Sequence, residues 1–144
     1  MNSLDTNILI YASNSAVQEH ESALGVVQTM LAEPSDWIIA DQVLWEYYKA
    51  LRHPLILSKP RTARQAADQV RFLREESGVA ACTYEIRQFS AVLEQIEDPR
   101  FPYQRTHDAV LATTLLGNGV TRFYTRNTKD FAEAGFTDLI DPID

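Results

Sequence analysis

The chain has 144 residues, of which 45% are hydrophobic and 23% are charged, and its formal net charge at pH 7 is −7. This length predicts one domain over residues 1–144 with a substantial core, and no apolar run approaches the roughly 20 residues of a membrane-spanning helix. The amino terminus has no basic segment of the kind that opens a signal peptide, and Cys82 is the only cysteine, so we expect a cytoplasmic protein without disulfides or membrane contact.

Charged residues are distributed unevenly along the chain. Residues 1–48 contain seven acidic side chains and no Lys or Arg. Residues 49–74 contain one acid, Asp68, and seven basic residues: Lys49, Arg52, Lys59, Arg61, Arg64, Arg71 and Arg74. Although the net charge disfavours nonspecific binding to nucleic acid, this asymmetry predicts an acidic pocket beside a basic surface. A solvated helix face is the alternative interpretation of the basic segment.

The first predicted strand, 1–4, leads directly to Asp5, a carboxylate inside an otherwise apolar run. A buried carboxylate requires a cation, a hydrogen-bond donor or a proton, because leaving it bare is costly. The apolar run 8–12 then begins a helix or prolongs the strand. Ligand sites in open α/β sheets lie just beyond the carboxyl ends of strands, which favours a functional Asp5. A simple helix cap is the alternative.

The next segment predicts a helix, a strand and a second helix in succession. Apolar residues recur at three- and four-residue spacing over 18–32, which is typical of an amphipathic helix. The run 37–40 predicts a short buried strand, and the helix 41–52 that follows has Asp41 as its expected N-cap. Glu46 lies about one turn into this helix, near its apolar face, and is expected to return over the carboxyl edge of the sheet. An exposed helix position is the alternative.

An arginine-rich amphipathic helix is predicted over 61–76, with its small and apolar residues inward and its arginines outward. A weak strand at 79–83, a helix at 84–96 and a loop at 98–102 follow. The outward arginines are candidate contacts for phosphates: Arg61, Arg64, Arg71 and Arg74.

The helix expected over 106–116 begins with Thr106 as its cap and carries Asp108 in its first turn. The helix dipole favours a carboxylate there by ~0.3–1 kcal/mol, and this benefit alone is the alternative reason for an acid at this position. The remaining predicted elements are a strand at 122–125, a polar loop at 126–131 and a strand at 138–140.

Strands that alternate with helices predict an α/β fold with a mostly parallel sheet between two helical layers. In that architecture the polar candidates gather at one edge of the sheet: Asp5, Glu46, Asp108 and the loop residues Asn127 and Asp130. Several carboxylates share a small site as anions only when divalent cations offset their repulsion, and all-oxygen ligands favour Mg²⁺ or Mn²⁺. The matching chemistry is phosphodiester hydrolysis by a metal-activated water. His107 adjoins Asp108 in sequence, but neighbouring helix residues point apart, so a catalytic role for His107 is not expected.

At these residues the sequence resembles the PIN-domain ribonucleases of the VapC toxin type. The resemblance spans nearly the whole chain and rests on four segments: Leu4-Asp5-Thr6-Asn7-Ile8-Leu9-Ile10-Tyr11-Ala12, Trp45-Glu46-Tyr47-Tyr48, Arg105-Thr106-His107-Asp108-Ala109 and Thr125-Arg126-Asn127-Thr128-Lys129-Asp130-Phe131. It implies a three-layer α/β/α sandwich and Mg²⁺-dependent cleavage of RNA, with Asp5 and Asp108 as metal ligands and Glu46 completing the site. The family's fourth acidic position falls on Asn127, with Asp130 three residues later, so the residue that fills it and the binding of a second metal stay open.

The resemblance also implies three partners: an RNA substrate, a VapB-like antitoxin whose basic residues enter the acidic site, and a second copy of the chain in a homodimer. If RNA is the substrate, the charge of the four outward arginines of 61–76 favours contact with its phosphates, and a solvated face or a contact with the protein partner is the alternative.

Two rival functions stay open at this stage. A metal-dependent phosphatase also places an Asp after its first strand, but such enzymes need a second Asp two residues later, where this chain has Asn7. A PIN-like module that binds RNA or protein without cutting is the other rival, and the joint presence of Asp5, Glu46 and Asp108 argues against it.

Overall fold

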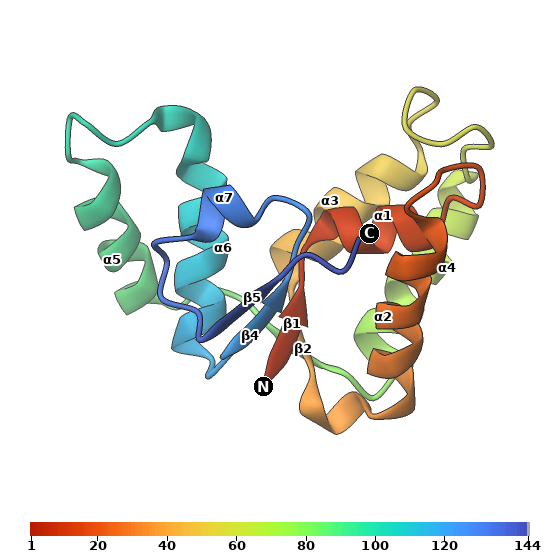
Figure 1. Cartoon of the computed structure of the whole chain (residues 1–144), viewed down its shortest axis with the longest axis horizontal. Coiled ribbons are helices and arrows are strands. Elements are labelled where there is room, and N and C mark those ends of the chain that lie inside the picture. The colour runs from red at the N-terminus through yellow and green to blue at the C-terminus, as the bar shows by residue number, and fades with distance from the viewer. Residues whose placement is uncertain (144) are drawn as a thin grey trace.

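Short strands form the middle layer of the molecule, and helices cover both of its faces (Figure 1). The computed structural model describes residues 1–143, so residue 144 of the predicted domain lies outside the described range. Each described strand has three residues and pairs in parallel with its neighbours. This arrangement confirms the predicted α/β fold with two helical layers.

The strands form two small sheets that meet at one point. The strands are β1 (Asn2–Leu4), β2 (Ile38–Ala40), β3 (Ala80–Cys82), β4 (Arg122–Tyr124) and β5 (Asp138–Ile140). One sheet has the order β1-β4-β5, and the other pairs β2 with β3. A single isolated bridge between Asn2 and Trp37 joins them. The predicted central sheet is therefore interrupted between β1 and β2, where the buried hydroxyl of Ser3 donates a hydrogen bond of 2.5 Å to the carbonyl of Ile38.

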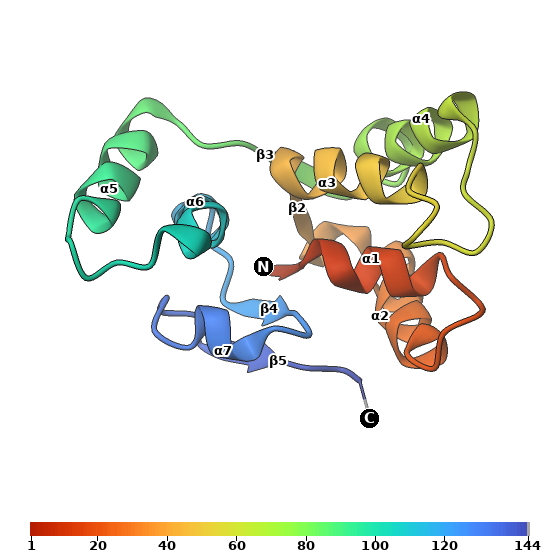
Figure 2. The same cartoon turned by 90° about the horizontal axis from the view of Figure 1, so that it is seen from above.

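The helices divide into two groups by chain order, and Figures 1 and 2 place the two groups on opposite sides of the strands. One group is α1 (Thr6–Ala12), α2 (His20–Ala32), α3 (Asp41–Leu51) and α4 (Ala63–Arg71), which continues into a π-helical turn, Phe72–Glu76. The other group is α5 (Ile86–Ile96), α6 (Thr106–Gly117) and α7 (Thr128–Phe131). Two 3₁₀ turns, Pro34–Asp36 and Tyr103–Arg105, precede β2 and α6.

Two expected helix caps are wrong, because their side chains have other partners. Asp41 is the first residue of α3 rather than its cap, and its carboxylate accepts a hydrogen bond of 2.8 Å from Arg74. The Thr106 hydroxyl donates to the carbonyl of Tyr103, at 2.6 Å, instead of accepting from the first turn of α6. Asp5, in contrast, does cap α1 through an acceptor bond from the Thr6 amide, so the run 8–12 belongs to a helix.

The segment predicted as a polar loop over 126–131 contains the short helix α7. Tertiary packing explains the difference, since Phe131 at the end of α7 is 2% exposed and lies against aromatic residues of the core. Its ring centroid is 5.0 Å from that of Phe123 on β4, and Phe123 stacks on Phe136 at 4.9 Å. The hydrophobic effect on a single aromatic anchor thus outweighs the loop preference of the polar residues around it.

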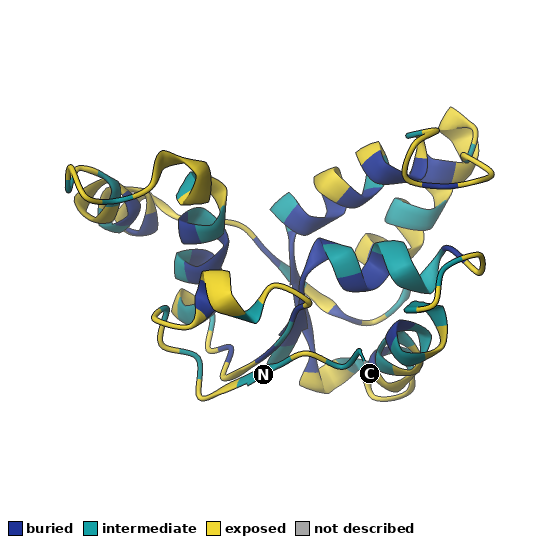
Figure 3. Ribbon diagram, turned by 45° about the horizontal axis from the view of Figure 1, so that its top comes forward, coloured by how far each residue is buried: buried dark blue, intermediate teal, exposed yellow. Residues whose placement is uncertain are grey.

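The core lies where the strands meet the inner faces of the helices, as the buried colouring of Figure 3 shows. Leu4, Phe123 and Ile39 supply the strand side of this core and are almost fully buried. Trp37, just before β2, stacks on Tyr124 of β4 with ring centroids 5.3 Å apart, and this contact bridges the two sheets. Within residues 1–143, no helix is long and apolar enough to cross a membrane.

The Ser3 hydroxyl offers a test of how the two sheets are held together. We expect Ser3→Ala to lower the free energy of unfolding by about 1–3 kcal/mol, because the carbonyl of Ile38 loses a buried partner. Ser90→Ala is the matched control, since the Ser90 hydroxyl makes an exposed bond of 3.4 Å within α5 and its loss should change stability by less than about 0.5 kcal/mol. Chemical denaturation of both variants measures the difference. Equal stabilities would show that Ser3 does not join the sheets.

Candidate active site

Asp5 is positioned by the parallel pairing of β1 with β4. Leu4 lies opposite Tyr124 in the register of this pair, and the Asp5 amide donates a hydrogen bond of 2.9 Å to the Tyr124 carbonyl. Asp5, the first residue after β1, therefore lies beside Thr125, the first residue after β4. The side chain of Asp5 is almost wholly buried, with 9% of its residue surface exposed.

Both oxygens of the Asp5 carboxylate accept hydrogen bonds. Oδ1 accepts from the Thr6 amide at 2.8 Å, and Oδ2 accepts from the Thr125 hydroxyl at 2.8 Å and from the Asn7 side-chain amide at 3.4 Å. Helix capping and a site at the strand end were alternative interpretations of Asp5, yet the structure combines them. One oxygen caps α1, while the residue as a whole lines a cavity at the strand ends.

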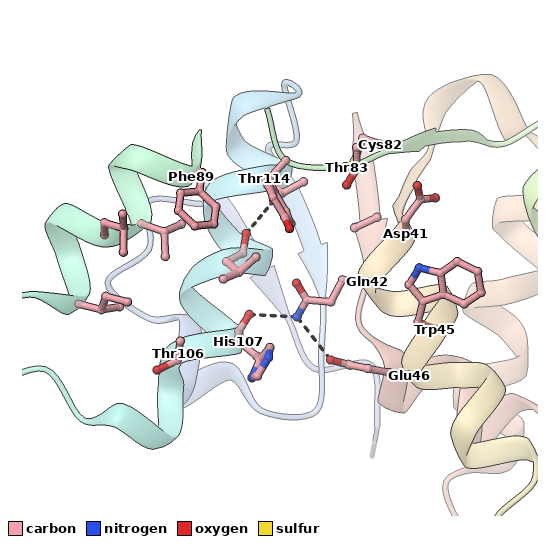
Figure 4. A pocket seen from close by; sticks show the side chains of 16 residues that line it. Asp41, Gln42, Trp45, Glu46, Cys82, Thr83, Phe89, Thr106, His107 and Thr114 are labelled. Carbon is pink, nitrogen blue, oxygen red and sulfur yellow. Dashed lines mark hydrogen bonds between the residues drawn. The ribbon is translucent and has the colours of Figure 1, made fainter. Parts of the chain in front are cut away.

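Glu46 reaches the same cavity from α3 and is tied to two other elements. Its Oε2 accepts a bond of 2.7 Å from the Thr6 hydroxyl on α1. The side-chain amide of Gln42 donates to Glu46 Oε1 at 3.4 Å and to the His107 carbonyl at the start of α6 at 3.0 Å (Figure 4). Glu46 is exposed, and it lines the cavity of Asp5. Its orientation thus depends on Thr6 of α1 and on Gln42, one turn earlier on α3, which in turn bonds to α6.

One cavity of about 390 Å³ collects most of the predicted site residues. Asp5, Glu46, Asp108 and Asn127 all line it, and they come from the ends of β1 and β4 and from α3 and α6. Asp130 lies elsewhere: it lines a neighbouring cavity with Asp108 and pairs with Arg105 at 3.4 Å. Asn127 is therefore the loop residue in the cavity of Asp5, and Asp130 lies on the other side of Asp108.

Burial and neighbouring carboxylates raise the pKa of Asp5 and of Asp108. Burial is the main reason that the pKa of Asp5 rises from 3.8 to about 6, with smaller upward contributions from Glu46 and Asp108. Hydrogen bonds from Thr125 and Thr6 oppose this rise because they stabilise the anion. The pKa of Asp108 is also raised, first by burial and then by the charges of Asp130 and Glu46. Such like-charge repulsion is what a bound cation relieves.

The donor set of the cavity fits a hard divalent cation, since carboxylate and amide oxygens are the ligands that Mg²⁺ and Mn²⁺ prefer. Mg²⁺ retains several waters and is commonly held by only one or two carboxylates, which matches Asp5 and Asp108. In residues 1–143, no three His, Cys, Asp or Glu side chains form a ready-made metal cage. The cavity therefore suits a largely hydrated ion and not one enclosed by protein ligands.

The predicted arginine surface is largely engaged in contacts within the chain. Arg71 pairs with Asp68 at 2.6 Å, and Arg74 pairs with Asp41 at 2.8 Å. Arg61 donates to the carbonyl of Ser13 at 3.1 Å. Arg64 is exposed on α4. None of the four lines the cavity of Asp5, so any contact that they make with phosphates lies away from the carboxylates.

Sequence reasoning assigned no role to three residues that orient the carboxylates. Thr125 is fully buried and holds Asp5, whereas Thr6 and Gln42 hold Glu46. The adjacency of Thr125 to Asp5 follows from the pairing of β1 with β4, which a single sequence does not reveal. Thr6 had a local signal, because a hydroxyl directly after the strand end lies at the start of a helix, beside its cap.

Comparison with known proteins assigns the fold and then the family. A scan against models of protein families finds none that matches this chain. Among solved structures, VapC20 of Mycobacterium tuberculosis, described as a sarcin–ricin loop cleaving toxin, superposes with a TM-score of 0.67 at 18% identity, over 94% of this chain and 96% of that one. FitAcB from Neisseria gonorrhoeae superposes with a TM-score of 0.61 at 16% identity, over 99% and 98% of the two chains.

The fold and the acidic cavity at the strand ends thus define a PIN-domain protein. At the level of sequence, the chain is 33% identical over 147 residues to ribonuclease VapC24 of two Mycobacterium tuberculosis strains, CDC 1551 / Oshkosh and H37Rv. The alignment covers 99% of this chain and 97% of the relative. The chain belongs to the VapC family of PIN-domain ribonucleases, the toxins of type II toxin–antitoxin systems.

The raised pKa of Asp5 predicts how stability depends on pH in the presence of a chelator. Below pH 3.8 the carboxyl group is protonated in both the folded and the unfolded state, so its burial carries no electrostatic cost. Above about pH 6 it is charged in both states, and the fold is destabilised by about 3 kcal/mol relative to low pH. We therefore expect Asp5→Asn to stabilise the fold increasingly, relative to wild type, as pH rises from 4 to 6.

Thermal unfolding in EDTA across this pH range measures the effect. Asp98→Asn is the control, because hydrogen bonds from the Arg100 side chain and backbone lower the pKa of Asp98, so its removal cannot stabilise the fold as pH rises. An Asp5→Asn variant whose stability relative to wild type stays constant with pH would contradict the assigned environment of Asp5.

Proposed function

We propose that this VapC ribonuclease is an endoribonuclease that hydrolyses RNA phosphodiesters with the help of Mg²⁺, for which Mn²⁺ can substitute, held by Asp5 and Asp108. The observation that supports this proposal is the convergence of Asp5, Glu46, Asp108 and Asn127 on one cavity. An acidic cavity of this kind binds an anionic substrate only when a cation neutralises it, so the metal and the substrate are bound together.

A bound divalent ion would supply a more acidic water and would withdraw charge from the phosphoryl oxygens. The residues of the chain supply position and proton transfer. The Thr6 hydroxyl fixes one oxygen of Glu46, which leaves this carboxylate oriented to accept a proton from the attacking water. The Asn127 amide supplies a neutral group at the fourth position. Asp130 acts on Asp108 through its charge.

The structure bears on both rival functions. Asn7, which occupies the position of the second phosphatase Asp, donates to Asp5 and accepts from the Arg126 amide at 3.3 Å. It therefore holds the loop after β4 in place and carries no charge for acid–base chemistry. A module that binds without cutting would not need three carboxylates in one cavity, because burial and nearby charges raise the pKa of Asp5 and of Asp108 and so lower the stability of the fold.

The proposed protein partners are a VapB-like antitoxin and a second copy of the chain. The family consists of toxins of toxin–antitoxin systems. The structures of FitAB bound to the IR36 DNA fragment and of FitAcB share this fold. We propose that the antitoxin inserts an Arg or Lys side chain into the acidic cavity, where its charge would compete with a metal for the same oxygens. Exposed Arg64 is the member of the arginine surface best placed to contact RNA.

The face between α3 and α5 supports the proposed homodimer. A groove of about 660 Å³ lies between α3, α5 and α6 (Figure 4). Large apolar side chains around it are unusually exposed for a protein surface: Trp45 at 68%, Tyr84 at 49%, Phe89 at 53% and Leu93 at 48%. A contiguous apolar surface of this kind marks an interface. Because Glu46 and Gln42 also line this groove, a second copy bound here would lie close to the active-site cavity.

Asp108→Asn tests the catalytic assignment. We expect Mg²⁺-dependent cleavage of total ribosomal RNA to fall by at least about a hundredfold, which is the upper limit for loss of a residue that merely supports a metal ligand. The fold should persist, and its melting temperature should not decrease, because the substitution removes repulsion with Asp130 and Glu46. Asp36→Asn, at an exposed position on a 3₁₀ turn, should cleave like the wild type. A fully active Asp108→Asn enzyme would refute the assignment.

Phe89→Glu tests the homodimer. A charge at this exposed position of α5 should convert a dimer into a monomer without unfolding the chain, because a buried interface does not tolerate an unpaired carboxylate. Light scattering after size exclusion gives the mass directly. Phe72→Glu is the control, since Phe72 is also half-exposed, at 43%, but lies on the π-helical turn after α4. A monomeric wild-type protein, or a variant that stays dimeric, would show that this face does not join two copies.

A further inference from the structure

The active-site cavity extends well beyond its carboxylates, along the groove between α1 and α3. Past Glu46 it is lined on one side by Lys49 and by His53 just beyond the end of α3, and on the other by Ile10 of α1. Glu46, Lys49 and His53 are spaced by three and four residues, so they share one face of the helix and its final turn. The cavity therefore has an acidic end and a basic end.

The two ends of this cavity interact oppositely with a nucleic acid strand. An RNA strand that reaches the carboxylates carries a negative charge at every nucleotide. A metal held by Asp5 and Asp108 would neutralise the carboxylates where the strand is cut, but it would not balance the phosphates on either side of that position. Basic side chains in the same cavity can balance them, and the lining of this cavity includes two, Lys49 and His53.

Lys49 is exposed, and the ion pairs found within residues 1–143 do not include it. This distinguishes it from Arg71 and Arg74, which are both paired with carboxylates. An ammonium group on a flexible stem is suited to contact phosphate as a point charge. Lys49 thus combines a charge that is available for a ligand with a position inside the cavity.

The hydrogen bond of the His53 ring defines which of its two nitrogens carries the proton. Its Nδ1 accepts a hydrogen bond of 3.1 Å from the Leu55 amide, and a backbone N–H can only donate, so Nδ1 carries no proton. The neutral ring must then carry its proton on Nε2. Turn geometry after α3 therefore prepares one specific ring nitrogen as a hydrogen-bond donor to an anion in the cavity.

We propose that Lys49 and His53 bind RNA phosphates within about three nucleotides of the one that is cut, and so set the path of the strand along α3. The inference rests on the proposed ribonuclease function of the same cavity. Glu46 and His53 are separated by about two helical turns, or about 10 Å along the axis. At a rise of roughly 3.4 Å per nucleotide, this span corresponds to about three nucleotides of a helical strand. Lys49, about one turn from Glu46, can therefore contact the phosphate next to the scissile one, and His53 can contact a phosphate about three nucleotides away.

If Lys49 and His53 had only structural roles, their substitution would have different effects from the loss of phosphate contacts. Lys49 in the last turn of α3 interacts favourably with the helix dipole, and His53 stabilises the turn that follows. Loss of either role would change thermal stability and leave the affinity for RNA unaltered. Loss of phosphate contacts would do the reverse, and it would also reduce the dependence of affinity on salt.

The experiment compares four variants of the full chain: Lys49→Ala, His53→Asn, His53→Gln and the control Lys59→Ala. Asn places its oxygen near the position of Nδ1 and preserves the acceptor for the Leu55 amide, whereas Gln places its amide near the position of Nε2 and preserves the donor. Lys59 is an exposed lysine of the loop between α3 and α4. The probe is a fluorescein-labelled single-stranded RNA of mixed sequence, with binding followed by anisotropy in Ca²⁺ and cleavage followed in Mg²⁺.

We expect Lys49→Ala and His53→Asn each to weaken RNA binding by roughly three- to tenfold. For Lys49→Ala, the slope of log affinity against log salt should also become shallower by about 0.7. His53→Gln and Lys59→Ala should bind like the wild type. Cleavage should show a raised KM with kcat little changed, because these contacts lie outside the reacting group.

Failure of this inference is distinguishable from failure of the proposed function. A wild-type protein that neither binds nor cuts RNA would overturn the ribonuclease function itself. If the wild type binds and cuts, but Lys49→Ala behaves like Lys59→Ala and the two His53 variants behave alike, the ribonuclease function stands and the phosphate contacts are refuted. A partner-protein role for Lys49 and His53 would appear as this second outcome.

Discussion

The pairing of β1 with β4 is the constraint on which the candidate active site depends. It places the Thr125 hydroxyl against the Asp5 carboxylate, so that a buried anion has a fixed donor on one side and the first amide of α1 on the other. These bonds offset part of the desolvation that raises the pKa of Asp5. A slip of one residue between the two strands would bring Tyr124 or Arg126 to this position and remove the donor. The pairing of these two short strands thus fixes the position of the Asp5 side chain.

The remaining parts of the site are held by hydrogen bonds that connect helices across the cavity. Thr6 on α1 and Gln42 on α3 both bond to Glu46, and Gln42 continues to the carbonyl of His107 on α6. These contacts hold like charges near one another against their mutual repulsion. Because burial and nearby charges raise the pKa of Asp5 and of Asp108, the arrangement lowers the stability of the fold at pH values above the ordinary pKa of a carboxyl group. An arrangement that opposes stability is typical of a site that a ligand completes.

Helix α3 has three faces, and each contacts a different part of the molecule. Its buried face, with Val43, Leu44 and Leu51, packs into the core. A second face carries Glu46 and Lys49 into the active-site cavity. The third presents Trp45 to the apolar groove against α5. Because all three faces belong to one helix, a protein partner bound at the groove and an RNA strand bound in the cavity would be separated only by the width of α3. This geometry links the proposed dimer to the path proposed for RNA.

Local patterns in the sequence predicted the five strands and most of the helices, and they proposed Asp5, Glu46 and Asp108 as candidates, because alternation, helical spacing and strand-end position are short-range signals. They were insufficient where a distant partner decides. Asp41 and Thr106 satisfy local rules for helix caps, yet one is bound by Arg74 and the other by Tyr103. Residues 126–131 contain a helix because Phe131 packs on Phe123. Whether Asn127 or Asp130 shares the cavity of Asp5 also depended on the tertiary structure, since the choice rests on how the chain after β4 turns against α6 and not on the spacing of two residues.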